Sequence, residues 1–177
     1  MKAPTFPATR LLPLAMALLV AAAAGGSDDQ KKPEQKGPPT EKVVIGAETF
    51  KLQIAADPKT RIRGLMQRTK IDDHGGMLFV FRKSMRRSFW MKNCLVDIDL
   101  VFLDRRGRIV ALHKMKVQPP RRKSESEGAY HRRLKSYPSH RRSQFAIELK
   151  AGSIDRLKLK LDKTIGLDFK KLKKLAK

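Results

Sequence analysis

The sequence Phe89-Trp90-Met91-Lys92-Asn93, followed closely by Ile98-Asp99-Leu100-Val101-Phe102-Leu103, sets our expectation of both fold and site. The second segment is a short apolar run of strand length, which is typical of a buried β-strand. If the first segment is also a strand, its lysine and its amide lie within what is otherwise core. Polar groups inside such a strand need hydrogen-bond partners or an opening onto a pocket. This segment is therefore our candidate site.

Further strands are predicted on both sides. Residues 48–54 alternate apolar and polar side chains, as in a half-buried strand, whereas residues 77–81 form a continuous apolar run. Residues 108–112 follow a tight turn, and residues 145–149 alternate again. With six or seven strands against two or three short helices, the predicted fold class is mainly β, a small single-domain β-sandwich or partly open barrel.

One of the short helices is predicted after Asp57-Pro58, an N-cap residue followed by a proline at the first helical position. Ile62, Leu65 and Met66 would form its apolar face. Gly64 inside such a helix costs about 1 kcal/mol relative to alanine. A close approach of another segment to the backbone would explain this glycine.

The two ends of the chain differ from its centre. Residues 1–24 have the positive start, apolar core and small residues of a signal peptide, so we expect export to the periplasm or the extracellular space. An uncleaved N-terminal membrane anchor is the alternative. Residues 25–42 are polar and proline-rich, which predicts a disordered linker before a domain at 43–166. Residues 167–177 form a basic amphipathic tail that could contact a membrane or pack on the domain.

The charge balance favours anionic partners. Forty Lys and Arg against 17 Asp and Glu give a formal net charge of +23. Such a field attracts anionic envelope polymers and lipid, and export disfavours nucleic acid. Residues 116–136 lack periodicity, and a loop of this length is either functional or mobile. The expected anion-binding surface consists of Arg86, Arg87, Arg121, Arg122, Lys123, Arg132 and Arg133.

The residues that could carry chemistry are few. A single cysteine, Cys94, excludes an internal disulfide framework and a cysteine-rich zinc site, and the four histidines show no ligand spacing. We predict no metal and no cofactor. Burial is the better interpretation of Cys94 than nucleophilic catalysis. The candidate ligand site consists of Trp90, Lys92, Asn93 and Asp99. The alternatives are a buried polar network that fixes strand register and a structural pair of Lys92 with Asp99.

Several short motifs occur in an order that resembles a known family. They are Arg63-Gly64-Leu65-Met66, residues 76–81, residues 89–93, Asp99, residues 102–104, residues 107–110, Tyr137-Pro138-Ser139 and residues 146–152. Over about residues 43–166, this order resembles the uncharacterised bacterial and archaeal family known as domain of unknown function 192. The resemblance implies a mainly-β sandwich, often exported, with no established activity. The chain departs from the family pattern at Cys94, Asp97 and Leu161-Asp162-Lys163, where threonine, proline and a Pro-Gly-Asp turn are usual.

From these observations we expect an exported, non-enzymatic binding or accessory module with a small polar site next to Trp90. A first alternative is an envelope-associated hydrolase that uses Asp99 and Lys92. A second is a polyanion-binding protein that acts through its basic loop and tail. The partner would be an anionic envelope polymer or a small polar ligand.

Overall fold

The computed structural model describes residues 38–177. The predicted signal peptide and most of the predicted linker lie outside these residues. The first strand begins at Thr40, so the last residues assigned to the linker belong to the domain. Their composition is polar, but each pairs with a residue of the next strand, and this pairing overrides the local signal. Among the described residues, no helix is long and apolar enough to span a membrane.

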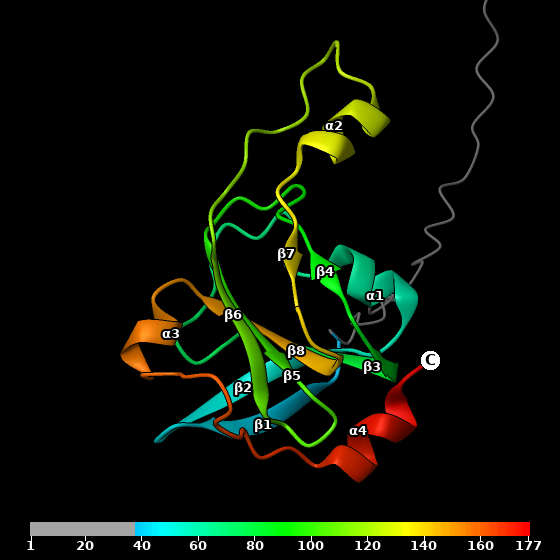
Figure 1. Ribbon diagram of the computed structural model, residues 1–177. Helices are drawn as coiled ribbons and strands as arrows, with labels where there is room; N and C mark the ends of the chain where they lie inside the picture. Colours follow the sequence, from blue (N-terminus) through cyan, green and yellow to red (C-terminus); the bar gives the residue numbers. More distant parts are fainter. Residues whose placement is uncertain (1–37) are drawn as a thin grey trace, which may run out of the picture. The chain divides into compact units, whose positions relative to one another are not determined.

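The described residues form eight strands and four short helices (Figure 1). The strands are β1 (Thr40–Ile45), β2 (Glu48–Ala55), β3 (Met77–Met85), β4 (Ser88–Phe89), β5 (Ile98–Leu103), β6 (Ile109–Met115), β7 (Tyr137–Pro138) and β8 (Ser143–Lys150). The helices are α1 (Pro58–Arg63), α2 (Glu127–Arg133), α3 (Ser153–Arg156) and α4 (Phe169–Leu175).

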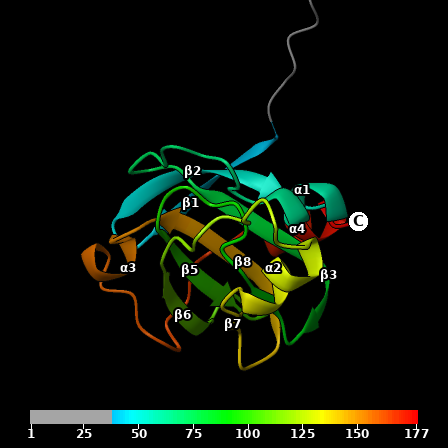
Figure 2. The same ribbon diagram turned by 90° about the horizontal axis from the view of Figure 1, so that it is seen from above.

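Six strands form one mixed sheet in the order β1-β2-β3-β8-β5-β6, and β4 pairs with β7 in a second, two-stranded sheet. Only the β2–β3 pair of the large sheet is parallel. The mainly-β prediction is confirmed, and the large sheet is open rather than closed into a barrel. Figure 2 shows β8 and β5 near the middle of the large sheet, and Figure 1 shows β4, β7 and α2 above it.

Both faces of the large sheet carry a hydrophobic core, which explains the continuous apolar runs. In β5, Val101 and Leu103 belong to the cluster on one face, whereas Leu100 and Phe102 belong to the cluster on the other. In β8 the same alternation places Glu148 on the face of the second cluster, where it is 5% exposed. Glu148 is therefore buried, although alternation predicts an exposed polar residue at its position, because the second cluster also covers its face of the sheet.

The expectation that Phe89–Asn93 forms a core strand was wrong beyond its first residue. The strand β4 ends at Phe89, and the chain then turns, with Asn93 in the left-handed region at a φ of 52°. The backbone N–H of Asn93 donates to the hydroxyl of Tyr130 in α2 at 3.2 Å. This turn depends on a residue distant in the sequence, so local strand propensity could not predict it.

The segment 116–136 is not structureless, because it contains α2. Ser126 caps this helix through a hydrogen bond from the Ala129 backbone N–H to its hydroxyl. Tyr130 on α2 is 1% exposed. The helix is therefore anchored to the domain by a buried aromatic side chain.

The C-terminal tail packs on the domain. Asp168 caps α4 by accepting from the Lys171 backbone N–H, and Leu172 is fully buried in the same cluster as Val101. The terminal Lys177 donates its backbone N–H to the Ala56 carbonyl at 2.9 Å. The apolar stripe that could have contacted a membrane is thus part of the core.

Candidate functional site

A cavity of about 390 Å³ opens between α1, the end of β3 and β4. Its apolar wall consists of Phe79, Phe81 and Phe89, and Trp90 borders it. Phe89 contacts the other two rings edge to face, with ring centroids 4.9 Å from Phe79 and 6.4 Å from Phe81. The pairing of β4 with β7 holds Phe89 in this position, since Phe89 lies opposite Tyr137. The wall is thus a preformed aromatic surface.

Glu148 contributes a buried carboxyl to the same cavity. Its Oε2 atom is inaccessible to solvent and has no hydrogen-bond partner among the described residues. Burial raises the pKa of Glu148 from 4.5 to about 8, and the Leu65 backbone N–H only partly opposes this shift. At neutral pH the group is therefore largely a neutral carboxylic acid when nothing else is bound.

Gly64 lies beside the Glu148 carboxyl, directly after α1. The helix ends at Arg63, and Gly64 follows it with a φ of 49°. A Cβ atom at Gly64 would lie 3.5 Å from Glu148 Oε2 and 3.4 Å from Phe79 Cζ. These are ordinary van der Waals distances, so the positive φ, rather than a lack of space for a side chain, favours glycine here. The predicted helix was one turn too long, because it included Leu65 beyond this glycine.

Four arginines line the cavity, and two of them are engaged by the protein. Arg61 donates to the carbonyls of Ala56 at 2.6 Å, Val80 at 3.1 Å and Lys177 at 2.9 Å, so it ties the C-terminus to β3. Arg87 lies 3.6 Å from the centroid of the Phe81 ring, in a cation–π contact.

Arg87 is held in place by its neighbours. One of its terminal nitrogens donates to the Lys83 carbonyl at 2.5 Å, and its buried Nε atom has no described partner. Burial, with a smaller contribution from the charge of Arg61, lowers the pKa of Arg87 to about 10. The residue remains a cation at neutral pH.

The other two arginines, Arg63 and Arg86, have exposed side chains. Neither forms a side-chain hydrogen bond or an ion pair within the described part of the chain. They leave two cations free at the mouth of an aromatic cavity. Such an arrangement favours a ligand with an apolar body and an anionic group.

Cys94 also lines the cavity but is a poor nucleophile. Burial, together with the nearby Glu148 carboxyl, raises the pKa of its thiol to about 12. The thiol is therefore protonated across the neutral range. Within residues 38–177, no group of three or more His, Cys, Asp and Glu side chains is placed to hold a metal ion.

The structure brings three of the four predicted site residues together around α2. Trp90 is 44% exposed, and its ring lies 5.1 Å from that of His131, centroid to centroid. The Lys92 ammonium contacts the carboxylate of Glu127 and the Nε2 atom of His131. This contact with Lys92 is the main reason that the pKa of Glu127 is lowered. The Asn93 side chain is exposed and accepts from the Tyr130 hydroxyl at 3.4 Å.

The fourth residue, Asp99, lies elsewhere. It is 1% exposed on β5, and its Oδ2 atom accepts a hydrogen bond from the Ile154 backbone N–H at 2.7 Å. Burial raises the pKa of Asp99 although this hydrogen bond opposes it. Lys92 and Asp99 thus have separate partners on α2 and α3. The structure does not assemble the pair that the hydrolase hypothesis requires.

The expected anion-binding surface is not one continuous patch. Arg133 pairs with Glu125 at 2.7 Å, and Arg121 lies 3.4 Å from Glu127, so these two are partly neutralised. Arg86 and Arg87 belong to the cavity. Three exposed basic residues of the α2 loop form no described ion pair, namely Arg122, Lys123 and Arg132.

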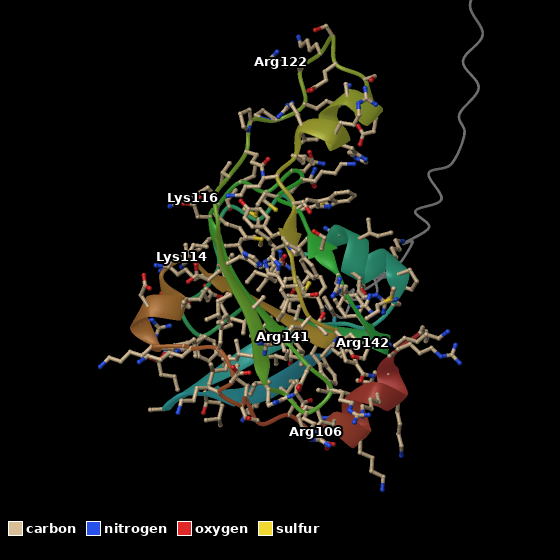
Figure 3. The ribbon with its side chains drawn as sticks, in the orientation of Figure 1. Arg106, Lys114, Lys116, Arg122, Arg141 and Arg142 are labelled. Carbon is tan, nitrogen blue, oxygen red and sulfur yellow. The ribbon has the colours of Figure 1, made fainter. Side chains whose placement is uncertain are left out.

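Other basic side chains lie far from this loop. Figure 3 shows Arg122 near the tip of the α2 loop, Arg141 and Arg142 in the lower half of the domain, and Arg106 near its opposite end. The charge is therefore distributed over several surfaces. We use the name loop cluster below for Arg122, Lys123 and Arg132.

The sequence interpretation missed Glu148 as a cavity residue and did not connect Gly64 with the cavity. Glu148 is an acidic residue in an alternating apolar strand, and Gly64 is a glycine inside a helical pattern. Both are local irregularities of the kind that marks functional or strained positions. Only the glycine was noticed, and the partner that approaches it could not be named.

The family resemblance is confirmed. The family model DUF192, described as an uncharacterized ACR, matches residues 41–167. No curated protein sequence matches the chain.

Two solved structures share the fold. A protein from Sinorhizobium meliloti 1021, described as a proposed transcription regulator, is 24% identical, with a TM-score of 0.60 over 73% of this chain and 95% of that one. A protein of unknown function from Novosphingobium aromaticivorans is 19% identical, with a TM-score of 0.55 over 72% of this chain and 84% of that one. At this level of identity the likeness shows the fold alone.

Proposed function

The chain belongs to the DUF192 family, and we propose that it is a non-enzymatic binding module whose cavity takes a small organic anion with an apolar body. The observation that carries this proposal is the cavity of about 390 Å³, in which three phenylalanines meet two arginines that have no side-chain partner among residues 38–177. Ligand sites in proteins are typically apolar hollows with a few convergent polar groups. Trp90 at the border adds a further aromatic surface for the ligand.

Binding is favoured over catalysis because the candidate reactive groups are used structurally. The Cys94 thiol is protonated, Lys92 is paired with α2, and Asp99 bonds to the start of α3. A nucleophile would need an adjacent base in the same cavity. We therefore assign to the described residues a binding role rather than a hydrolytic one.

Anilinonaphthalene sulfonate, an aromatic anion, is a suitable probe for the cavity. Trp90 is the only tryptophan of the chain, so energy transfer from it to the bound dye reports occupancy beside the cavity. We expect saturable binding of one dye per chain. Substitution of both Arg63→Met and Arg86→Met should weaken binding at least about tenfold, because two charge-assisted contacts are lost.

The matched control replaces two exposed arginines outside the cavity, Arg105→Met and Arg106→Met, which changes the net charge equally. It should leave dye affinity nearly unchanged. Dye binding that does not saturate, or that falls equally in both double variants, would contradict the proposal.

We further propose that the protein acts outside the cytoplasm. The support for this is the signal-like sequence of residues 1–24, with Lys2 and Arg10 ahead of an apolar core. Fractionation of cells that express the full chain tests it. Recovery of the protein only from the cytoplasm would contradict export.

A second candidate function is binding of an acidic polymer through the loop cluster. The observation that favours it is that these three side chains are exposed and form no described ion pair, on a chain of net charge +23. Such binding would be independent of the cavity. Its salt dependence separates it from the first proposal.

A further inference from the structure

Glu148 adds to the cavity a carboxyl group with which none of the four arginines forms an ion pair. Its Oε2 atom is buried, and within residues 38–177 it has no hydrogen-bond partner and Glu148 forms no ion pair. A buried polar oxygen without a hydrogen-bond partner is costly, so such groups are normally satisfied by protein, water or ligand. The carboxyl borders the cavity, and Gly64 leaves the space beside its oxygen free of a side chain.

Two of the cavity's arginines, Arg61 and Arg87, are engaged by backbone carbonyls and the Phe81 ring, and the other two lie at a different depth from Glu148. Glu148 comes from the middle of β8 and is 5% exposed, whereas Arg63 and Arg86 are exposed at the mouth. Phe79 and Phe89 belong to the apolar wall that lines the same space. A ligand that spans the cavity would therefore meet an acceptor at its inner end and cations at its outer end.

We propose that the cavity selects a bifunctional ligand that carries an amine at its inner end for Glu148, an apolar spacer, and an anionic group at its outer end for Arg63 and Arg86. This inference rests on the proposed binding function. The ligand class is that of ω-amino acids with an apolar spacer. A simple organic anion would satisfy the arginines and leave the buried oxygen without a partner.

Binding of the amine changes the protonation of the carboxyl. Burial holds the pKa of Glu148 at about 8, so the empty site is mostly protonated at pH 7. An ammonium group favours the carboxylate, and the neutral acid then loses one proton to solvent as the ion pair forms. Affinity for the amine should consequently increase as the pH rises from 6 toward 8, because less work is needed to remove that proton. A simple carboxylate ligand should not show this increase.

The test uses three series of probes of increasing chain length: ω-aminoalkanoates, alkanoates and alkylamines. Each displaces anilinonaphthalene sulfonate from the full-length protein. At the best length, we expect the aminoalkanoate to bind at least about tenfold tighter than the alkanoate or the alkylamine of equal length. Calorimetry in two buffers of different ionisation enthalpy should detect release of up to one proton per amine bound.

Glu148→Gln should remove the preference for the amine while keeping the affinity for alkanoates and the dye. If this variant does not fold, the relative affinities of the three series for the wild-type protein still test the inference. Equal affinity of aminoalkanoates and alkanoates at every length, with dye binding intact, would overturn this inference alone. Failure of the dye and of all three series would overturn the proposed function as well.

Discussion

Glu148 is the residue at which the environment most changes the chemistry. Burial raises its folded-state pKa to about 8, whereas the unfolded chain retains a value near 4.5. Below pH 4.5 both states are protonated, so the group does not affect stability there. As the pH rises through 4.5 toward 8, the unfolded state loses a proton that the folded state keeps, and the folded protein loses stability across this window.

We expect Glu148→Gln to remove this pH dependence, because glutamine does not titrate. Between pH 5 and pH 8, the free energy of unfolding of Glu148→Gln should increase relative to that of the wild type by roughly 4 kcal/mol. Urea denaturation of both proteins at these two values measures the change. Asp72→Asn is the control, because Asp72 is exposed and its substitution should shift both curves little. Parallel pH profiles for wild type and Glu148→Gln would contradict the assigned burial.

The helix α2 is an element whose role depends on contacts across the chain. Lys92 and Asn93 reach it through Glu127, His131 and Tyr130, so α2 supplies the partners that these two polar residues need. We expected either a ligand or Asp99 in this role. The segment was predicted as a loop, because a single short helix between charged residues has little periodicity.

The helix α4 is an element that the core holds in place. Leu172 is fully buried in the large cluster, whereas Leu175 on the same helix is 38% exposed. Leu172→Ala should lower the free energy of unfolding by about 2–5 kcal/mol, because it leaves a cavity in the core. Leu175→Ala should change it by less than about 1 kcal/mol.

Urea denaturation of the two leucine variants measures the difference. Equal and small effects would mean that the tail is not docked on the sheet. In that case its apolar stripe would be free for a membrane surface, as the sequence alone allowed.

For the molecule as a whole, the high positive charge predicts salt-dependent binding to polyanions. With heparin as the probe, the logarithm of affinity should fall linearly with the logarithm of salt concentration. Replacing Arg122, Lys123 and Arg132 by glutamine should reduce this slope if the loop cluster makes the contacts. The matched control replaces Lys170, Lys173 and Lys174 of α4, which are also exposed.

Dye binding to the cavity should be unchanged in both triple variants. Equal slopes for the two variants would show that the net charge, rather than the loop cluster, governs polyanion binding. No measurable heparin binding at moderate salt would remove this second function.

Most of the large sheet could be predicted from the sequence, because its strands are coded by consecutive residues. The buried run at Ile98–Leu103, the alternation before Ala55 and the strand at Ser143–Lys150 all appear as local apolar patterns. The mainly-β class followed from these patterns, whereas the family followed from the resemblance of the ordered short motifs, and both are confirmed. The strand prediction was wrong where a contact with a distant residue determines the backbone conformation, as at Asn93, whose backbone N–H donates to the Tyr130 hydroxyl.

The cavity could not be predicted from the sequence alone and became visible only in the folded chain. Its walls come from α1, β3, β4 and β8, which the sequence separates and the sheet order brings together. A pattern of residues shows where a polar side chain falls on a strand, but its partner depends on what packs against that face. Lys92 meets Glu127 and His131, whereas the Oε2 atom of Glu148 meets no described donor. Strand identity is thus a local property, and the satisfaction of buried polar groups is not.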